Sequence, residues 1–362
     1  MKKISVRGVL SLCLVLFCGI TSFSLKGLPQ REVVPQPQRG VLTVWHVDTF
    51  EGGSGSRFDW LRRQSVLFQK KHPASPVCVS RYSYEQVRDL LQQGERFDVI
   101  SFSAGTGAEV LPYLKEYTGA VNVREDLLGA CYVGDKIMAL PYAYGGYCLS
   151  AFSDEASLPL KETLFTQYAE QGKKGEKFSL GFGSASFQLP WMALALGTTK
   201  TPQHALSVCP NRLTQYEAYE SFLNRDTFRV LLGTQRDLVR FDHRLQQGRL
   251  SPVTCEYLTE FTDLIQCIGC AQSENAPLAQ KFMEFLTSTA IQKNLKSLKL
   301  FPAAEVQLFD AGLLKDAEKA FSSTRFRVVN VFSSPEILHQ AASAAERAVR
   351  SGEKDALKNY LV

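Results

Sequence analysis

The chain has 362 residues, 45% of them hydrophobic, and a formal net charge of +5. That length exceeds what a single hydrophobic core usually fills, so we expect two domains. Lys2, Lys3 and Arg7 lie in the first 24 residues, and subtracting these three charges from five leaves about +2. No basic stripe with interleaved aromatic residues follows, which disfavours a nucleic-acid-binding protein.

Residues 1–24 have the pattern of a secretory signal peptide. A basic start precedes an uncharged apolar run at 8–20 and small residues at 22–24. The run is short for a membrane span, and an uncleaved anchor is the alternative. A bulky Phe17 precedes Cys18, which disfavours a lipid anchor. Residues 25–40, with three prolines and several glutamines, predict a flexible tether.

The cysteines do not define a site by spacing. Seven of the nine lie beyond the signal, and an odd number cannot all pair within one chain. Cys267 and Cys270 have the spacing of a redox pair but lack the strand-to-helix context of a thiol oxidoreductase. They are interpreted either as such a pair or as small buried hydrophobic residues.

The first hundred residues alternate between strand and helix patterns. A strand at 41–47 opens into a glycine-rich loop, followed by a helix at 56–72 and a strand at 77–82. Ser83 and Gln86 form a capping box that starts the next helix, and a strand at 97–102 runs into a small polar loop at 103–107. This alternation predicts a largely parallel sheet with helices on both faces.

A change of pattern follows near residue 131. Gly134 lies in a predicted hairpin, and the Gly145-Gly146 pair interrupts a strand-like run, which indicates a crossover between two lobes. A second α/β unit begins at Phe178, with a helix around Trp191. Apolar stripes at 279–289 and 291–298 predict helices, and a final helix starts with Ser-Pro-Glu at 334–336.

Six segments together resemble the extracellular solute-binding proteins of ABC importers, the branch that includes maltose-binding protein. They are LTVWHVDTFEGG (42–53), FDVISF (97–102), ALPYAYGGY (139–147), GTQRD (233–237), YLTEFTDLIQ (257–266) and the apolar stripe at 279–292. The resemblance implies an α/β, type II periplasmic-binding-protein fold: two lobes joined by hinge strands around a ligand cleft that closes by bending. It also implies lobes discontinuous in sequence, 41–145 plus about 258–305 and 146–257 plus about 306–362.

The first predicted wall of this cleft is the loop after the opening strand. Sugars need aromatic faces and planar hydrogen-bonding groups, and Trp45, Asp48 and Glu51 supply both. The glycine pair ending at Gly53 lets backbone N–H groups approach a ligand. Trp45 as a core residue and Asp48 as a turn cap are the alternatives.

Further candidates follow the other strands. Ser103 lies in the next loop, Tyr142 and Tyr144 lie at the crossover, and Trp191 follows a proline at a helix start. Surface turn, packing and core filling are their respective alternatives. In the polar GTQRD motif, Arg236 and Asp237 are candidates, with Arg236 able to fork onto hydroxyls or a carboxylate. An ion pair from Arg236 to Asp237 or Asp242 is the alternative.

Other classes fit less well. The loop after the first strand lacks the third glycine of a dinucleotide fingerprint, and neither a Walker motif, an esterase elbow nor a metal-binding histidine helix is present. The resemblance implies a non-enzymatic, extracytoplasmic, monomeric protein without cofactor or metal. We expect it to capture a small solute, in the first place a sugar or oligosaccharide, for a membrane permease. A secreted enzyme or a ligand-sensing module of the same fold is the alternative.

Overall fold

A six-stranded sheet is assembled from two distant parts of the chain. In the computed structural model its order is β12-β6-β11-β3-β1-β2. The strands are β1 (Leu42–Val47), β2 (Val77–Tyr82), β3 (Val99–Phe102), β6 (Leu140–Tyr144), β11 (Ile265–Cys270) and β12 (Phe301–Pro302). β1 lies parallel to β2 and β3, whereas β11 lies antiparallel to both β3 and β6. The structure describes residues 40–362 except 48–49, 51–52, 157, 167–176, 186, 199–205, 210–212 and 226.

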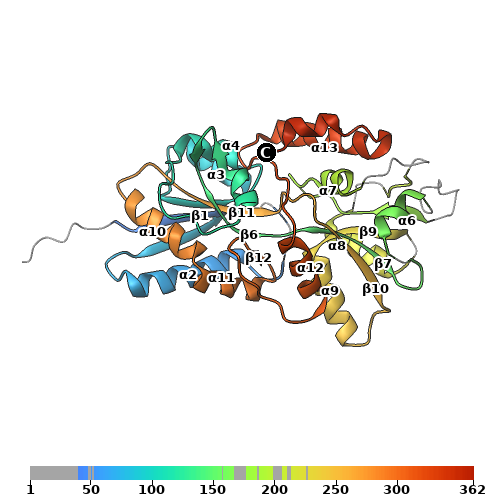
Figure 1. Ribbon diagram of the computed structural model, residues 1–362. Helices are drawn as coiled ribbons and strands as arrows, with labels where there is room; N and C mark the ends of the chain where they lie inside the picture. The colour runs from blue at the N-terminus through green and yellow to red at the C-terminus, as the bar shows by residue number, and fades with distance from the viewer. Residues whose placement is uncertain are drawn as a thin grey trace, which may run out of the picture. The chain divides into compact units, whose positions relative to one another are not determined.

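Six helices among the described residues accompany this sheet. They are α2 (Arg57–Lys71), α3 (Tyr84–Gln92), α4 (Gly107–Val110), α5 (Glu125–Leu128), α10 (Ala276–Thr287) and α11 (Thr289–Gln292). Both α2 and α3 begin within a residue of their predicted starts. The Ser83 side chain accepts from the Gln86 amide, which confirms the predicted capping box. α2 and α10 lie side by side (Figure 1), with the Phe68 and Phe282 rings 5.1 Å apart.

A second sheet of four strands comes from one continuous stretch. Its order is β10-β7-β9-β8, with β7 (Tyr147–Phe152), β8 (Phe178–Gly181), β9 (Phe228–Thr234) and β10 (Val253–Leu258). Only β8 and β9 are parallel; β7 lies antiparallel to both β9 and β10. The expectation of largely parallel pairing is therefore wrong outside the first strands. The chain enters β7 and β11 from the other sheet, at the edge where the parallel strands end, so both must run in the opposite direction.

The helices that accompany the four-stranded sheet include two from the end of the chain. They are α6 (Leu160–Thr166), α7 (Pro190–Gly197), α8 (Gln215–Leu223), α9 (Gln235–Gln246), α12 (Gly312–Ser322) and α13 (Pro335–Ser351). α13 packs along α7, and α12 packs against α9 (Figure 1). Short 3₁₀ turns are η1 (Leu111–Tyr113), η2 (Gly129–Cys131), η3 (Lys293–Leu298) and η4 (Asp355–Tyr360), and the predicted hairpin is β4 (Tyr132–Val133) with β5 (Lys136–Ile137).

Two short segments connect the sheets. Gly145 and Gly146 alone separate β6 from β7, which confirms the predicted crossover, and residues 259–264 lead back from β10 to β11. The Gln235 side chain accepts from the Gly146 amide at 3.1 Å, and the Thr262 hydroxyl donates to the Gly145 carbonyl at 2.8 Å. No helix among the described residues is long and apolar enough to cross a membrane.

Candidate functional site

A buried polar network lies where the parallel strands of the larger sheet end. His46 Nδ1 and Ser101 Oγ are 3.0 Å apart, and Ser101 Oγ is 2.9 Å from the Tyr142 hydroxyl. Gln266 donates from Nε2 to the same Ser101 oxygen at 3.0 Å. These side chains come from β1, β3, β6 and β11, and none is exposed. Ligands of open α/β sheets bind at this edge, so the network is the floor of a candidate site.

Three polar atoms near this floor are buried without a hydrogen-bond partner among the described residues. They are Gln266 Oε1 in β11 and the hydroxyls of Ser103 and Thr106, in the loop after β3. Ser103 and Thr106 are both almost completely buried. Leaving a buried hydroxyl or amide oxygen unpaired costs about 1–3 kcal/mol. A ligand hydroxyl or an ordered water would remove that cost.

The loop after β8 reaches across to the loop after β3. Phe187 has a left-handed backbone (φ 64°) and lies so close to Gly105 (φ 93°) that a Cβ on Gly105 would lie 2.4 Å from its ring. The Phe187 and Tyr84 rings also meet edge to face, 5.4 Å apart. An aromatic ring on a strained backbone therefore stands between the loops that follow strands of the two sheets.

Gln188 and Asp263 are both connected to the segment that carries Phe187. Gln188 follows Phe187 in the sequence, and Asp263 contacts the backbone at Leu189. Gln188 Nε2 is buried without a partner in the described part of the chain, and Gln188 lines a cavity of about 10 Å³ with Tyr147, room for one water. Asp263 accepts from the Tyr147 hydroxyl at 2.8 Å and from the Leu189 amide at 2.7 Å. Burial raises the pKa of Asp263 from 3.8 to about 6. Asp263 thus ties the second connecting segment to the loop that carries Phe187.

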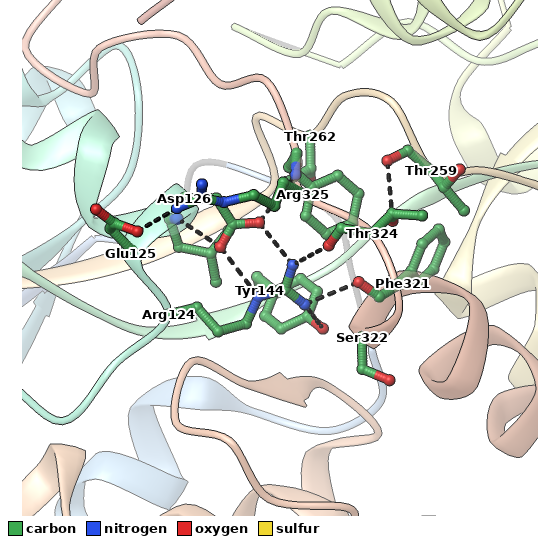
Figure 2. Close-up of polar contacts among 12 residues, drawn as sticks. Arg124, Glu125, Asp126, Tyr144, Thr259, Thr262, Phe321, Ser322, Thr324 and Arg325 are labelled. Carbon is green, nitrogen blue, oxygen red and sulfur yellow. Dashed lines mark hydrogen bonds and ion pairs between the residues drawn. The ribbon is translucent and has the colours of Figure 1, made fainter.

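A second polar cluster is centred on Arg124, in the segment before α5 (Figure 2). Arg124 donates to both carboxylate oxygens of Asp126, at 3.0 and 2.6 Å, and to the Phe321 and Thr324 carbonyls, each at 2.8 Å. It also donates to the Tyr144 hydroxyl at 3.1 Å. The guanidinium therefore closes off the carboxyl end of α12, where the helix dipole favours a cation.

An open cavity of about 500 Å³ adjoins this cluster. The residues that line it include Arg124, Asp126, Tyr144 and Glu318. The Glu318 carboxylate already accepts from the Leu308 and Phe309 amides. Because its most buried charges are paired with protein groups, this cavity offers a ligand less than the loops after β3 and β8 do.

Structural comparison decides the fold. The maltotriose-binding protein of Thermus thermophilus, solved with maltotriose, has a TM-score of 0.54 at 14% identity, over 88% of this chain and 96% of that one. A galacto-N-biose/lacto-N-biose I-binding protein of an ABC transporter from Bifidobacterium longum has a TM-score of 0.58 at 13% identity, over 88% and 94%. A Rhizobium etli sugar transporter in an open conformation has 0.56 at 12% identity, over 88% and 98%. The chain has the maltose-binding-protein-like fold.

Structural similarity confirms the predicted fold, whereas comparison of sequences alone finds no match. No protein-family model matches the chain, and no curated protein matches it in sequence. At 12–14% identity the similarity concerns the maltose-binding-protein-like fold alone. The structural neighbours named here are binding and transport proteins. No group of three or more His, Cys, Asp or Glu side chains in the described ranges could hold a metal ion.

Within this fold, four predicted ligand residues are packed among other side chains. Trp45 is 5% exposed and contacts the Tyr82 and Phe97 rings. Tyr142 stacks on Trp60 at 5.6 Å while its hydroxyl joins the network of the floor. Tyr144 lies between Phe301, Phe326 and Arg124, and Trp191 lies edge to face on Phe182 with Arg350 over its ring. Only the Tyr142 hydroxyl among these four reaches the floor network.

The other predicted residues lie in different settings. Ser103 lies beside the floor, as described, whereas Gly53 is pressed against the Leu298 carbonyl, 2.2 Å from where its Cβ would be. Asp237 accepts from the Thr234 amide in a capping box of α9 and pairs with Arg240. Arg236 is half-buried in the first turn of α9. Asp48 and Glu51 lie outside the described residues.

Sequence reasoning missed Phe187, Gln188, Asp263 and Gln266 as site residues. Asp263 and Gln266 belong to the YLTEFTDLIQ segment, which contributed to the family resemblance but was not considered for the site. A buried-strand pattern interrupted by Asp and Gln was the available signal, because buried polar groups need partners. Phe187 carries no such signal, since its contact with Gly105 joins residues distant in sequence.

Proposed function

We propose that the protein binds a neutral sugar or oligosaccharide between the loops that follow β3 and β8. The carrying observation is the set of buried polar atoms without a partner in the described residues. The unpartnered atoms near the two connecting segments and near the loops after β3 and β8 all belong to uncharged side chains. These are Ser103, Thr106, Gln188, Gln235 and Gln266. Uncharged donors and acceptors beside an aromatic ring suit hydroxyl groups and apolar sugar faces.

The wider role follows from the fold and the start of the chain. We propose an extracytoplasmic solute-binding component of an ABC import system, exported by residues 1–24, tethered by 25–40, monomeric and without catalytic activity. Each sheet would be the core of one lobe, with lobe boundaries as the sequence predicts. Closure would bend the connections at Gly145-Gly146 and 259–264 and bring the two loops onto the solute. The closed protein would then deliver the solute to a permease.

Ligand binding is tested first by a thermal-shift screen followed by calorimetric titration. Maltose, maltotriose and lacto-N-biose represent neutral sugars, and spermidine and inorganic phosphate represent charged solutes. A sugar that binds raises the melting temperature by mass action. Stabilisation by spermidine or phosphate alone, or turnover of the sugar, would contradict the proposal.

The site itself is tested with Ser103→Ala and Phe187→Ala. Loss of one hydrogen bond at Ser103 should weaken sugar affinity roughly 2- to 10-fold, and loss of the ring at Phe187 about tenfold or more. Ser75→Ala is the matched control, because Ser75 is an equally buried serine without a partner among the described residues, in the turn before β2. Equal effects of Ser103→Ala and Ser75→Ala would remove Ser103 from the site.

A further inference from the structure

Two buried thiols from distant segments touch. Cys131 ends η2, just before the β4–β5 hairpin, and Cys267 lies in β11, the strand that enters the middle of the larger sheet. Their Sγ atoms are 3.5 Å apart, and neither residue is exposed. Among the described residues no other two cysteine sulfurs are in contact; Cys148 and Cys255 both contact the hydroxyl of Ser150.

The pair with redox-like spacing is therefore not the pair in contact. Cys267 and Cys270 are three positions apart in one strand, so their side chains lie on opposite faces of the sheet. The Cys270 thiol points to the Lys115 carbonyl at 3.9 Å. A bridge between these two would require β11 to leave the sheet, where it pairs with both β3 and β6.

We propose that Cys131 and Cys267 form a disulfide when the chain folds in the presence of a disulfide oxidant. One thiolate attacks the oxidant, which gives a mixed disulfide and one free oxidant thiol. The second protein thiol then displaces the remaining oxidant thiol. The two cysteines together lose two electrons and two protons, and the oxidant disulfide becomes two thiols.

The geometry favours formation during folding. The two sulfur atoms need to approach by roughly 1.5 Å to reach a bond of about 2.05 Å, a small movement for side chains on adjacent segments. Both residues are fully buried, so in the folded protein an oxidant does not reach either sulfur. The bond must accordingly form before the core closes, which a folding experiment can control.

The test refolds the full chain in a Cys13→Ser/Cys18→Ser background, which leaves the seven other cysteines. Protein is refolded with reduced and oxidised glutathione or, in parallel, with dithiothreitol, then quenched in acid, alkylated in denaturant and mapped by mass spectrometry. We expect five alkylated cysteines and one cross-linked peptide pair joining Cys131 to Cys267. Seven alkylated cysteines, or a bridge that joins any other pair, would overturn the proposal.

Matched variants assign the effect on stability. The oxidised protein should have a higher urea midpoint than the reduced protein, and this difference should vanish in Cys131→Ala and persist in Cys270→Ala. If Cys131→Ala does not fold, the peptide map of the parent still decides. The added glutathione supplies the oxidant, so neither export nor sugar binding affects the outcome.

Discussion

Asp263 is a buried carboxyl group that links β7 to the loop after β8. Its two oxygens accept from Tyr147 in β7 and from the Leu189 amide beside Phe187. Burial raises its pKa to about 6, so its protonated form persists in the folded protein where the unfolded chain has already ionised. The contribution of Asp263 to stability therefore depends on pH.

The sign of this coupling can be predicted. Between about pH 4 and 6 the folded protein holds more protons at Asp263 than the unfolded chain, so the stability that Asp263 provides falls as pH rises. The pKa difference corresponds to roughly 3 kcal/mol across that range. In urea unfolding from pH 4 to 7, the stability of the parent relative to Asp263→Asn should decrease with pH by about that amount.

Asp310→Asn is the control for this series. Asp310 is exposed, and the Lys296 ammonium, 2.8 Å away, lowers its pKa. Both folded and unfolded forms are therefore ionised above about pH 5, and the parent and Asp310→Asn should differ by a constant amount there. A constant difference for Asp263→Asn as well would show that Asp263 titrates normally.

At this scale the sequence predicts residue types better than contacts. Ser103 was placed in a loop after a strand, and it lies beside the buried network. Trp45 precedes the end of β1, but alternation along the strand turns its ring toward Tyr82 and Phe97. Which side of a strand faces a site depends on packing against segments that are distant in sequence. Phe187 could not be predicted for the same reason.

Between elements, Arg124 is the principal polar link. It joins the segment before α5 to the carboxyl end of α12 and to Tyr144 at the end of β6 (Figure 2). Its side chain is 10% exposed and that of Asp126 6%. Removing one partner of so buried a pair leaves an uncompensated charge, whose cost exceeds the value of the pair.

We expect Arg124→Met to lower the free energy of unfolding by about 3 kcal/mol, measured in urea. Arg325→Ala serves as the control, because Arg325 pairs with Glu125 in the same region but both side chains are more than 70% exposed. That exposed pair should contribute about 0–1 kcal/mol. Similar losses for the two variants would mean that Arg124 is not a specific link between elements.

The starts of several helices were predictable, and strand pairing was not. Local signals such as the Ser83–Gln86 capping box and Pro335 in the first turn of α13 mark helix starts, and both are confirmed. No local signal indicates that β11 enters between β3 and β6, because its partners lie more than a hundred residues earlier in the chain. The direction and register of β11 are set by tertiary contacts alone.

For the whole molecule, the proposed site requires both sheets to respond to one solute. A sugar held between the loops after β3 and β8 should slow amide hydrogen exchange in residues 99–110 and 178–197 together, because opening either part would release the ligand. Exchange measured by mass spectrometry with and without saturating maltotriose, or whichever sugar the screen identifies, tests this. Protection confined to one stretch would place the solute on one sheet only.

The two-part α/β fold was predictable as a whole, since weak motifs in a fixed order carry information that each alone lacks. The comparisons confirm that fold at 12–14% identity. The solute is not predictable in the same way, because backbone similarity at that identity leaves the side chains of the two loops free to differ.

The late insertion of β11 also sets an order of events during synthesis. All four strands of the smaller sheet, from Tyr147 to Leu258, precede β11 along the chain. Until residue 270 has emerged, β3 and β6 lack their shared neighbour, and β3 presents an unpaired edge that can join other chains. The larger sheet can therefore close only after the whole smaller sheet has been synthesised, and its completion is a late event in folding.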